Sequence, residues 1–334
     1  MSAEILKDKT ILITGGTGSF GKSFVKYLLN NSQARKIIIF SRDELKQSQM
    51  QAELKNDQRL RFFIGDVKSL RRLQRAFYGV DVVIHAAALK QVSTLEYNPF
   101  EAVKTNILGS QNVIDAAIDQ GVEKAILIST DKASQPVNLY GSTKLCAEKL
   151  FISGNSYSGG KTKFCCVRYG NVIGSRGSII DKILCNQPVS ITDERMTRFW
   201  ITLEQSFKLV IFALANMEKG EIFIPKIPSM KLVDLLEAVE PGVKREVIGI
   251  LPGEKIHEIL LAKEEARHAV ELADYYVILS EFPSFSPEVY QKYYQWGKKL
   301  KPDFFYASDT NQDWLTKERL SVIIEQLKKS KLYS

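Results

Sequence analysis

Thr14-Gly15-Gly16-Thr17-Gly18-Ser19-Phe20-Gly21 is the stretch that decides the fold of this chain of 334 residues. An apolar run at residues 10–14 precedes it, and a stretch of helical period at residues 22–29 follows it. Glycines let a backbone approach a pyrophosphate, and a helix N-terminus offers unpaired N–H groups and a favourable dipole. An ordinary tight turn is the alternative, but a strand before and a helix after favour a dinucleotide-binding loop. Its predicted cofactor contacts are Gly15, Thr17, Gly18, Ser19, Phe20 and Gly21.

Outward from this loop, short apolar runs alternate with stretches of helical period. The runs lie at residues 10–14, 36–40, 60–64, 82–84, 125–129 and 164–168. This alternation is typical of a parallel sheet with helices on both faces, so we predict an α/β fold with a Rossmann-type doubly wound sheet. After residue 169 the segments become shorter and contain more prolines. We therefore expect a dinucleotide-binding domain at residues 1–169 and mainly a smaller substrate-binding lobe at residues 170–334, with some segments returning to the sheet.

Composition places the chain among ordinary globular proteins, with 45% hydrophobic and 25% charged residues. Its longest apolar runs are far shorter than the roughly 20 residues that cross a bilayer, and its start lacks the apolar region of a secretory signal. We expect a cytoplasmic protein that contacts no membrane. The four cysteines lack metal-ligand spacing, which predicts free thiols and no metal site. The formal net charge of +8 is spread along the chain, which favours a small polyanion over nucleic acid as a partner.

The end of the second apolar run indicates the type of cofactor. About 20 residues past the loop, an NAD enzyme places an acid for the ribose 2′-hydroxyl, and this chain has Ser41-Arg42 there. Arg42 can bind a 2′-phosphate, so we predict NADP, while the neighbouring Asp43 leaves NAD open. Ser41 and Glu44 could also form a helix capping box, and both roles can hold. The predicted contacts here are Ser41, Arg42, Asp43, Glu44 and Lys46.

Further cofactor contacts are expected after the third and fourth runs. Asp66 is placed to meet an adenine ring, although it could equally cap a helix. Small residues follow the fourth run, where a cofactor would cross the sheet edge, and Lys90 beyond them is either a phosphate or substrate contact or a solvated loop lysine. The predicted contacts are Asp66, Val67, Ala86, Ala87, Lys90 and Asn106.

Tyr140 and Lys144 form the predicted catalytic pair. A spacing of four residues puts them on one face of the helix that follows the fifth run. A tyrosine hydroxyl is a poor base near neutral pH, and a neighbouring cation lowers its pKa. We expect Lys144, together with the charge of the nicotinamide, to supply this effect. Both residues are also predicted cofactor contacts.

The phosphate loop, Thr130, Tyr140 and Lys144 resemble the extended short-chain dehydrogenase/reductase superfamily. Longer strings are similar to one family within it, the soluble inverting UDP-N-acetylglucosamine 4,6-dehydratases that open pseudaminic acid biosynthesis. These strings are Ser41-Arg42-Asp43-Glu44-Leu45-Lys46-Gln47, His85-Ala86-Ala87-Ala88-Leu89-Lys90, Thr130-Asp131-Lys132-Ala133, Arg168-Tyr169-Gly170-Asn171-Val172, Gly174-Ser175-Arg176-Gly177-Ser178, Met196-Thr197-Arg198-Phe199-Trp200 and Pro252-Gly253-Glu254-Lys255.

This resemblance implies a mechanism of dehydration. In the family, the cofactor takes a hydride from carbon 4, water leaves from carbon 6 and the hydride returns there, so a tightly bound NADP is regenerated in each turnover. Matching positions would make Tyr140 the base at the 4-hydroxyl, held by Lys144, with Thr130 as hydrogen-bond partner. Asp131 would protonate the leaving hydroxyl. Lys132 would remove the carbon 5 proton and allow its return on the opposite face, which requires burial or neighbouring cations to lower the pKa of this lysine.

The resemblance also implies a UDP-sugar substrate and a homo-oligomer. The matching substrate contacts are Lys90, Asn171, Arg176, Thr192, Arg198 and Glu258. The chain departs from the family between residues 178 and 191, where it is shorter and lacks a proline-aromatic stretch. This puts contacts from Lys182 and the choice of sugar in question.

Three other interpretations remain at the level of the sequence. On the same scaffold, a retaining 4,6-dehydratase or a 4-epimerase of another nucleotide sugar is the first rival, and retaining relatives carry Asp-Glu where this chain has Asp131-Lys132. An NADP-sensing regulator without catalysis is the second rival, although it would be expected to have lost Tyr140 or Lys144. A solvated charged loop is the alternative for Asp131-Lys132 itself.

Overall fold

The computed structural model describes residues 3–175, 178–184, 189–240, 245–281 and 287–329. Its centre is a ten-stranded sheet in the order β16-β14-β15-β10-β6-β5-β4-β1-β2-β3. The strands from β3 to β10 pair in parallel, whereas β15, β14 and β16 add antiparallel pairs at one side. The parallel strands are β1 (Thr10–Thr14), β2 (Lys36–Ser41), β3 (Leu60–Ile64), β4 (Val82–His85), β5 (Lys124–Ile128), β6 (Lys163–Val167) and β10 (Ile222–Pro225). The others are β15 (Tyr275–Ile278), β14 (Ala269–Glu271) and β16 (Lys298–Lys299).

The predicted α/β fold is confirmed, and the six predicted strands agree with β1 to β6 within a residue at each end. The agreement follows from burial: β1 is buried along its whole length because helices cover both faces of the sheet. The strand order reverses between β1 and β4, and ligands of doubly wound sheets bind at such a point, outside the carboxyl ends of the strands.

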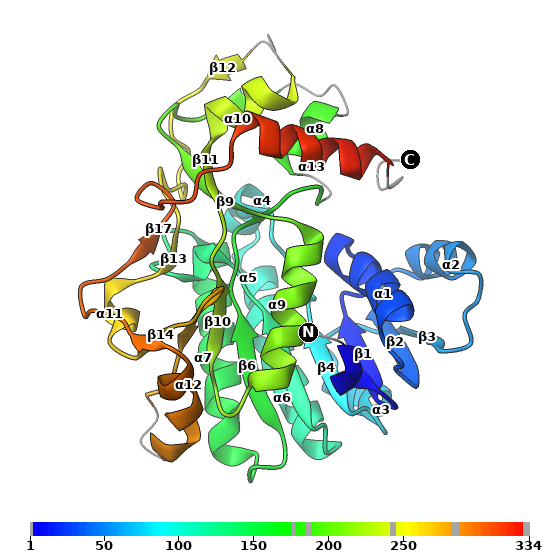
Figure 1. Ribbon diagram of the computed structural model, residues 1–334. Helices are drawn as coiled ribbons and strands as arrows, with labels where there is room; N and C mark the ends of the chain where they lie inside the picture. The colour runs from blue at the N-terminus through cyan, green and yellow to red at the C-terminus, as the bar shows by residue number, and fades with distance from the viewer. Residues whose placement is uncertain (1–2, 176–177, 185–188, 241–244, 282–286, 330–334) are drawn as a thin grey trace.

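Helices cover the sheet in two layers (Figure 1). On one face, α1 (Ser19–Asn31) packs against α9 (Leu203–Asn216) through an aromatic cluster that includes Phe24 and Phe207. On the other face, α6 (Gly109–Asp119) packs between α3 (Leu70–Phe77) and α7 (Leu139–Tyr157). The remaining helices near the sheet are η1 (Ala3–Leu6), α2 (Glu44–Glu53), α4 (Val92–Tyr97), α5 (Pro99–Ala102), η2 (Val103–Leu108), η3 (Asp131–Ala133), α11 (Lys263–Ala266), η4 (Pro287–Tyr290) and α12 (Gln291–Trp296).

A smaller layer lies over the carboxyl ends of the parallel strands, at the top of Figure 1. Its strands are β7 (Asn171–Val172), β9 (Thr197–Ile201) and β11 (Ser229–Lys231) in one sheet, and β8 (Val189–Ile191) with β12 (Arg245–Val247). The pair of β13 (Ile259–Leu261) with β17 (Tyr306–Ala307) lies lower, at the left of Figure 1, and packs on the core of the main sheet. The helices of the smaller layer are α8 (Ile179–Leu184), α10 (Leu232–Val239) and α13 (Lys317–Lys329). Trp200, Leu235 and Leu320 belong to a separate apolar cluster in this layer. Since α9, β10, β14, β15 and β16 return to the main sheet, the division at residue 169 stays a prediction.

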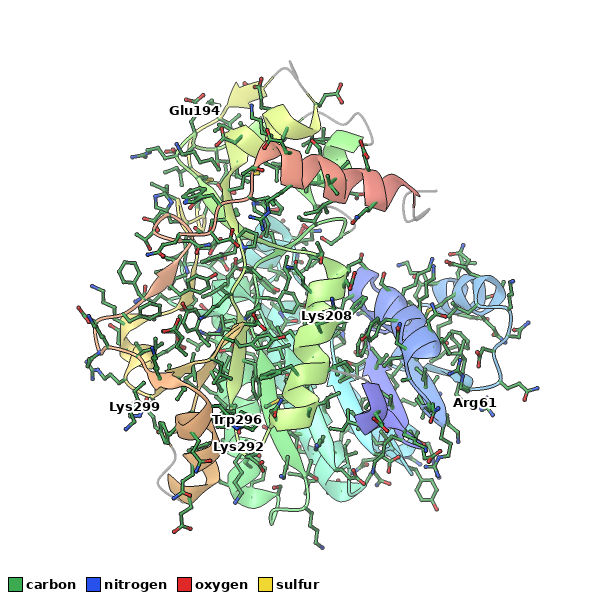
Figure 2. The ribbon with its side chains drawn as sticks, in the orientation of Figure 1. Arg61, Glu194, Lys208, Lys292, Trp296 and Lys299 are labelled. Atoms are coloured by element: carbon green, nitrogen blue, oxygen red, sulfur yellow. The ribbon has the colours of Figure 1, made fainter. Side chains whose placement is uncertain are left out.

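Both edges of the main sheet carry basic side chains. Arg61 extends from β3 at one edge and Lys299 from β16 at the other (Figure 2). Both side chains are exposed. Charges on an edge strand oppose pairing with the edge of another molecule, so these positions protect a long sheet from aggregation. Within the described ranges, no helix is long and apolar enough to span a membrane.

Candidate active site

The phosphate loop joins β1 to α1 through a turn that requires glycine. Gly15 has φ 65°, and its carbonyl accepts a hydrogen bond of 2.9 Å from the N–H of Gly18, the N-cap of α1. A Cβ on Gly15 would lie 2.9 Å from the backbone of Ala87, and one on Gly21 would lie 2.6 Å from Gly16. The glycines therefore let the ends of β1 and β4 and the first turn of α1 meet closely. This is a cradle of backbone groups that fits the phosphates of a dinucleotide.

A buried hydrogen-bond network holds the residues beside this cradle in place. Thr14 Oγ1 lies 2.7 Å from His85 Nδ1, and His85 Nε2 lies 3.1 Å from Ser110 Oγ. Thr14 Oγ1 also accepts from the N–H of Ala87 at 3.2 Å, and Ser110 Oγ donates to the carbonyl of Asn106. Burial, with a smaller effect of Lys144, lowers the pKa of His85 to about 3, so this imidazole is neutral. This role of His85 was not predicted from the sequence, although the place of His85 at the end of a buried strand could have indicated it.

The predicted 2′-phosphate contacts lie at and just after the end of β2, where Arg42 and Lys46 are accessible and Ser41 is buried. Arg42 is 58% exposed, and its guanidinium lies 3.7 Å from Asp66. The N-cap of α2 is Asp43, which accepts from the N–H of Lys46 and pairs with its Nζ at 2.8 Å, so the cap suggested for Ser41 with Glu44 is not formed. The Ser41 hydroxyl instead accepts from Gln47.

Asp66 does not form the helix cap that was suggested for it as an alternative role. Its Oδ1 accepts from the N–H of Lys68 at 3.0 Å, while the N-cap of α3 is Ser69. The Asp66 carboxylate thus stays beside Arg42, on the side of the sheet where the predicted adenosine end would lie.

A cleft of about 770 Å³ lies between the carboxyl ends of the parallel strands and the smaller layer. It brings together most of the predicted cofactor, catalytic and substrate residues: Gly15, Gly18, Ser19, Phe20, Gly21, Ala86, Lys90, Thr130, Lys132, Tyr140, Lys144, Asn171, Thr192, Arg198 and Glu258. Its described lining does not include Thr17, Ser41, Arg42, Asp43, Glu44, Lys46, Asp66, Val67, Ala87, Asn106 and Asp131.

Two of the predicted contacts need separate comment. Asn106 is buried and its amide is bonded to Leu89 and to the hydroxyl of Thr143, so it fixes the segment before Lys90 instead of facing the cleft. Arg176 lies outside the described residues.

Asp131 and Lys132 begin the short helix η3, directly after β5. The Thr130 hydroxyl donates to Asp131 Oδ1 at 2.9 Å, and Lys132 Nζ donates to the same oxygen at 3.1 Å. The ammonium also lies 3.2 Å from Glu258 Oε1 and 3.5 Å from Asn171 Oδ1. Since Asp131 is 1% exposed, the pair is not a solvated charged loop.

Burial and carboxylates set the charges in this cluster. Burial raises the pKa of Asp131, although Lys132 opposes the effect. Burial would lower the pKa of Lys132, but the carboxylates of Asp131 and Glu258 outweigh it and raise this pKa above its usual value. The lowered pKa expected for Lys132 is therefore wrong for this arrangement, because its nearest charged neighbours are anions.

Tyr140 and Lys144 lie on α7, whose first turn packs against η3. Burial raises the pKa of Tyr140 to about 12, and the opposing cation is Lys132. Lys144 donates to the carbonyl of Ile128 at 2.7 Å, and burial lowers its pKa to about 8. Lys132 is thus the cation that lowers the pKa of Tyr140 here, and the predicted effect of Lys144 together with a nicotinamide stays a prediction. Gly141 makes the packing possible, because a Cβ at this position would overlap the carbonyl of Lys132.

On the substrate side of the cleft, the predicted substrate contact Arg198 is already hydrogen-bonded within the protein. Arg198 is 7% exposed, and its guanidinium donates to the carbonyls of Thr197, Lys255 and Ile256. Its Nε lies 3.6 Å from Glu258 Oε1.

Two further substrate positions differ in accessibility. The Thr192 hydroxyl lies against Met196 at the wall of the cleft. Lys182, on α8, is exposed, so no cleft contact is seen for it.

Other residues of this region had no predicted role. Lys255 donates to the carbonyl of Ser134 at 2.6 Å and so ties the loop before β13 to η3. Glu148, one helical turn beyond Lys144, forms a buried pair with Arg168 at 2.6 Å. The spacing from Lys144 could have indicated Glu148, whereas only the fold brings Lys255 to Ser134.

Comparison with known proteins agrees with this geometry. A family model described as polysaccharide biosynthesis protein matches residues 11–280. The inverting UDP-N-acetylglucosamine 4,6-dehydratase of Campylobacter jejuni is 49% identical over 325 residues, which cover 95% of this chain and 97% of the relative. A UDP-glucose 4-epimerase of Rickettsia felis is 42% identical over 304 residues, covering 87% and 88%. The X-ray structure of Pen from Bacillus thuringiensis superposes with a TM-score of 0.86 at 41% identity, covering 96% of this chain and 99% of that one. The chain therefore belongs to the polysaccharide biosynthesis protein family, and within it to the group that contains the inverting UDP-N-acetylglucosamine 4,6-dehydratases.

Proposed function

We propose that the protein is a UDP-N-acetylglucosamine 4,6-dehydratase that inverts carbon 5 and produces UDP-2-acetamido-2,6-dideoxy-β-L-arabino-hex-4-ulose, as a first step towards pseudaminic acid. One observation carries this proposal: Lys132 and Tyr140 line a single cleft with Asp131 bonded behind them, in a chain 49% identical to an inverting dehydratase.

The residues have complementary tasks in this reaction. Tyr140 would take the proton of the 4-hydroxyl, with the Lys132 ammonium stabilising the phenolate. Asp131, whose pKa is raised by burial, would deliver a proton to the leaving 6-hydroxyl. Lys132, as the neutral amine formed when its ammonium gives up a proton, would take the carbon 5 proton and return it on the opposite face. Two protons leave the sugar and two are returned, one of them in water, so the net reaction is loss of one water molecule.

A nicotinamide dinucleotide fits the residues at the other end of the cleft. When bound, it would accept a hydride from carbon 4 and give it back at carbon 6. The glycine cradle would hold its phosphates, and Lys144 would lie at its nicotinamide end. Arg42 and Lys46, both about half exposed, would bind a 2′-phosphate, which supports NADP as the cofactor.

The preference for NADP can be tested with Arg42→Ala. Because the guanidinium is the principal cation proposed for the 2′-phosphate, we expect the affinity for NADP to fall by about tenfold or more, with the affinity for NAD nearly unchanged. Calorimetric titration of apoprotein with each dinucleotide gives both values. Equal losses for the two cofactors would contradict the assignment.

A 4-epimerase is the second candidate, because the Rickettsia relative is a UDP-glucose 4-epimerase at 42% identity. The two activities differ in mass balance. Purified protein supplied with UDP-N-acetylglucosamine and no reductant is expected to yield a nucleotide sugar lighter by one water, as read by mass spectrometry. A product of unchanged mass would favour the epimerase, and unchanged substrate with folded, cofactor-bound protein would exclude this sugar. A homo-oligomer also stays a prediction, which analytical ultracentrifugation tests.

A further inference from the structure

The Lys132 ammonium lies between two carboxylates that come from distant parts of the chain. Asp131 precedes it in η3, and Glu258 comes from the segment that enters β13. The two contacts are nearly equal in length, 3.1 Å to Asp131 Oδ1 and 3.2 Å to Glu258 Oε1. Glu258 is 2% exposed. A buried carboxylate at this distance is a specific partner of the ammonium rather than a screened neighbour.

The backbone of Glu258 is held in place. Its N–H donates to the hydroxyl of Ser308 at 2.9 Å, and its carbonyl accepts from the N–H of Ser308 at 2.9 Å. Ser308 is itself buried and bonded to Thr197 on β9. The carboxylate therefore reaches the cleft from an anchored segment.

The two oxygens of Glu258 have different surroundings. Oε1 is shared by Lys132 and the Nε of Arg198 at 3.6 Å. Oε2 lies 4.0 Å from Lys255 Nζ and, among the described residues, has no hydrogen-bond partner. Glu258 was expected to bind the substrate, but the oxygen nearest the catalytic residues is already engaged by cations of the protein.

We propose that Glu258 is a positioning residue, which holds the Lys132 ammonium in the cleft and keeps it protonated between substrate turnovers, rather than a ligand of the sugar nucleotide. This inference rests on the proposed function for its catalytic meaning. Its physical content, the pairing of Glu258 with Lys132, does not depend on the identity of the sugar.

The charges that face Lys132 show why Glu258 matters. Asp131 and Glu258 favour the ammonium, whereas Arg198 opposes it, and the buried Tyr140 hydroxyl is the other titratable group close by. Lys255 lies behind Glu258. Without the Glu258 charge, only the Asp131 carboxylate favours the ammonium form of Lys132. Arg198, Lys255 and the cost of burial all oppose it. An opposite charge within about 4–6 Å commonly changes a pKa by about one to three units, so the neutral amine should become accessible at lower pH.

Chemical labelling tests this pairing without any turnover. The rate of acetylation of Lys132 by acetic anhydride, read by peptide mass spectrometry across pH, gives the midpoint for loss of its proton. In Glu258→Gln, which preserves the shape of the side chain, we expect this midpoint to fall by about one to three pH units. Glu258→Asp, which retains the charge, should restore most of the difference. Glu264→Gln is the matched control, since Glu264 is exposed on α11, and it should leave the midpoint unchanged. An unchanged midpoint in folded Glu258→Gln would overturn the proposal.

The pH dependence of turnover supplies the second measurement. In Glu258→Gln, the limb of the kcat profile that reflects Lys132 should move to lower pH in parallel with the labelling midpoint, while KM for UDP-N-acetylglucosamine changes little. If Glu258 instead bound the substrate, KM would rise about tenfold or more in Glu258→Gln and the labelling midpoint would stay unchanged. This result would contradict the positioning role. If wild-type protein makes no product, the proposed function fails, whereas the labelling result still decides the role of Glu258.

Discussion

Burial determines the protonation of the groups beneath and within the cleft. His85 and Lys144 have lowered pKa values, whereas Asp131 and Tyr140 have raised ones, and burial is the largest cause in each case. Lys132 is the exception, since two carboxylates outweigh its burial. A carboxyl group with a raised pKa beside a charged lysine places a proton donor and a cation together, which a dehydration requires.

His85 provides a test at the residue scale. Its pKa is about 3 in the folded chain and is expected near 6.5 in the unfolded chain, so only the unfolded chain gains this proton between those values. Stability from the neutral imidazole is therefore complete above pH 6.5 and is lost as the pH falls towards 3. We expect His85→Asn to be less stable at pH 7, because one bond to Thr14 or Ser110 is lost. Its free energy of unfolding should nevertheless fall less steeply with acid, by up to about 1.4 kcal/mol per pH unit.

Urea unfolding at several pH values between 4 and 7 gives both slopes. Parallel slopes for wild type and His85→Asn would show that His85 takes up its proton in the folded chain as in the unfolded chain. This result would contradict the lowered pKa of His85.

The residues of the site could be predicted from sequence more readily than their charges. Tyr140 and Lys144 stand in a local pattern, and Asp131-Lys132 follow a recognisable strand. The environment of Lys132 could not be predicted in this way, because Glu258 and Arg198 come from segments far along the chain. The same reason hid the role of Lys255, whose partner Ser134 is distant in sequence.

At the scale of elements, a buried ionic network joins the core of the sheet to the segment that carries Glu258. Arg168, directly after β6, is 0% exposed. Its guanidinium contacts Glu148 on α7 at 2.6 Å, Glu265 on α11 at 2.9 Å and the carbonyl of Leu260 on β13 at 3.0 Å. The network thus fixes β13, and with it the neighbouring Glu258, against the helix that bears Tyr140 and Lys144.

Replacing Arg168 should be costly. Arg168→Met leaves the buried Glu148 carboxylate without its charged partner, for which a loss of about 3–5 kcal/mol in the free energy of unfolding is expected. Arg319→Met is the matched control, because Arg319 pairs with Asp313 at the surface and should contribute less than about 1 kcal/mol. Chemical denaturation measures both, and similar losses in the two variants would show that the buried network is not a major source of stability.

The elements themselves differ in how far the sequence predicted them. Strands β1 to β6 were predictable because both of their faces are buried, which gives short continuous apolar runs. The strands of the smaller layer have two to five residues, and their pairing depends on contacts between distant segments. Caps were the least predictable feature: Asp43 and Ser69 begin α2 and α3, although Ser41 and Asp66 were equally suitable residue types.

At the scale of the whole molecule, the cleft lies between the large apolar cluster of the main sheet and smaller apolar clusters of the layer above it. One of the smaller clusters contains Trp200, Leu235 and Leu320. Residues from both sides line the cleft, with the glycine loop below and Thr192, Arg198 and Trp200 above. Cofactor and substrate binding should therefore respond differently to damage in the smaller clusters.

Leu320→Ala tests this separation. Leu320 is fully buried where α13 packs on α10, so its truncation should destabilise the smaller layer by about 2–5 kcal/mol. We expect KM for the UDP-sugar to rise several-fold while the Kd for the dinucleotide stays the same. Measuring both constants on the same preparation decides the matter, and an equal loss of both affinities would mean that the two sides of the cleft are not independent.

The most direct test of the inverting dehydratase is proton NMR of the reaction in heavy water, with wild-type protein, Lys132→Ala and Tyr140→Phe. We predict that wild type converts UDP-N-acetylglucosamine into a 6-deoxy-4-keto sugar of L-arabino configuration with deuterium at carbon 5. Each variant should lose about 100-fold or more of this activity while still binding the cofactor. A D-xylo product would contradict inversion, and full activity of Lys132→Ala would contradict the central role of the Asp131-Lys132 pair.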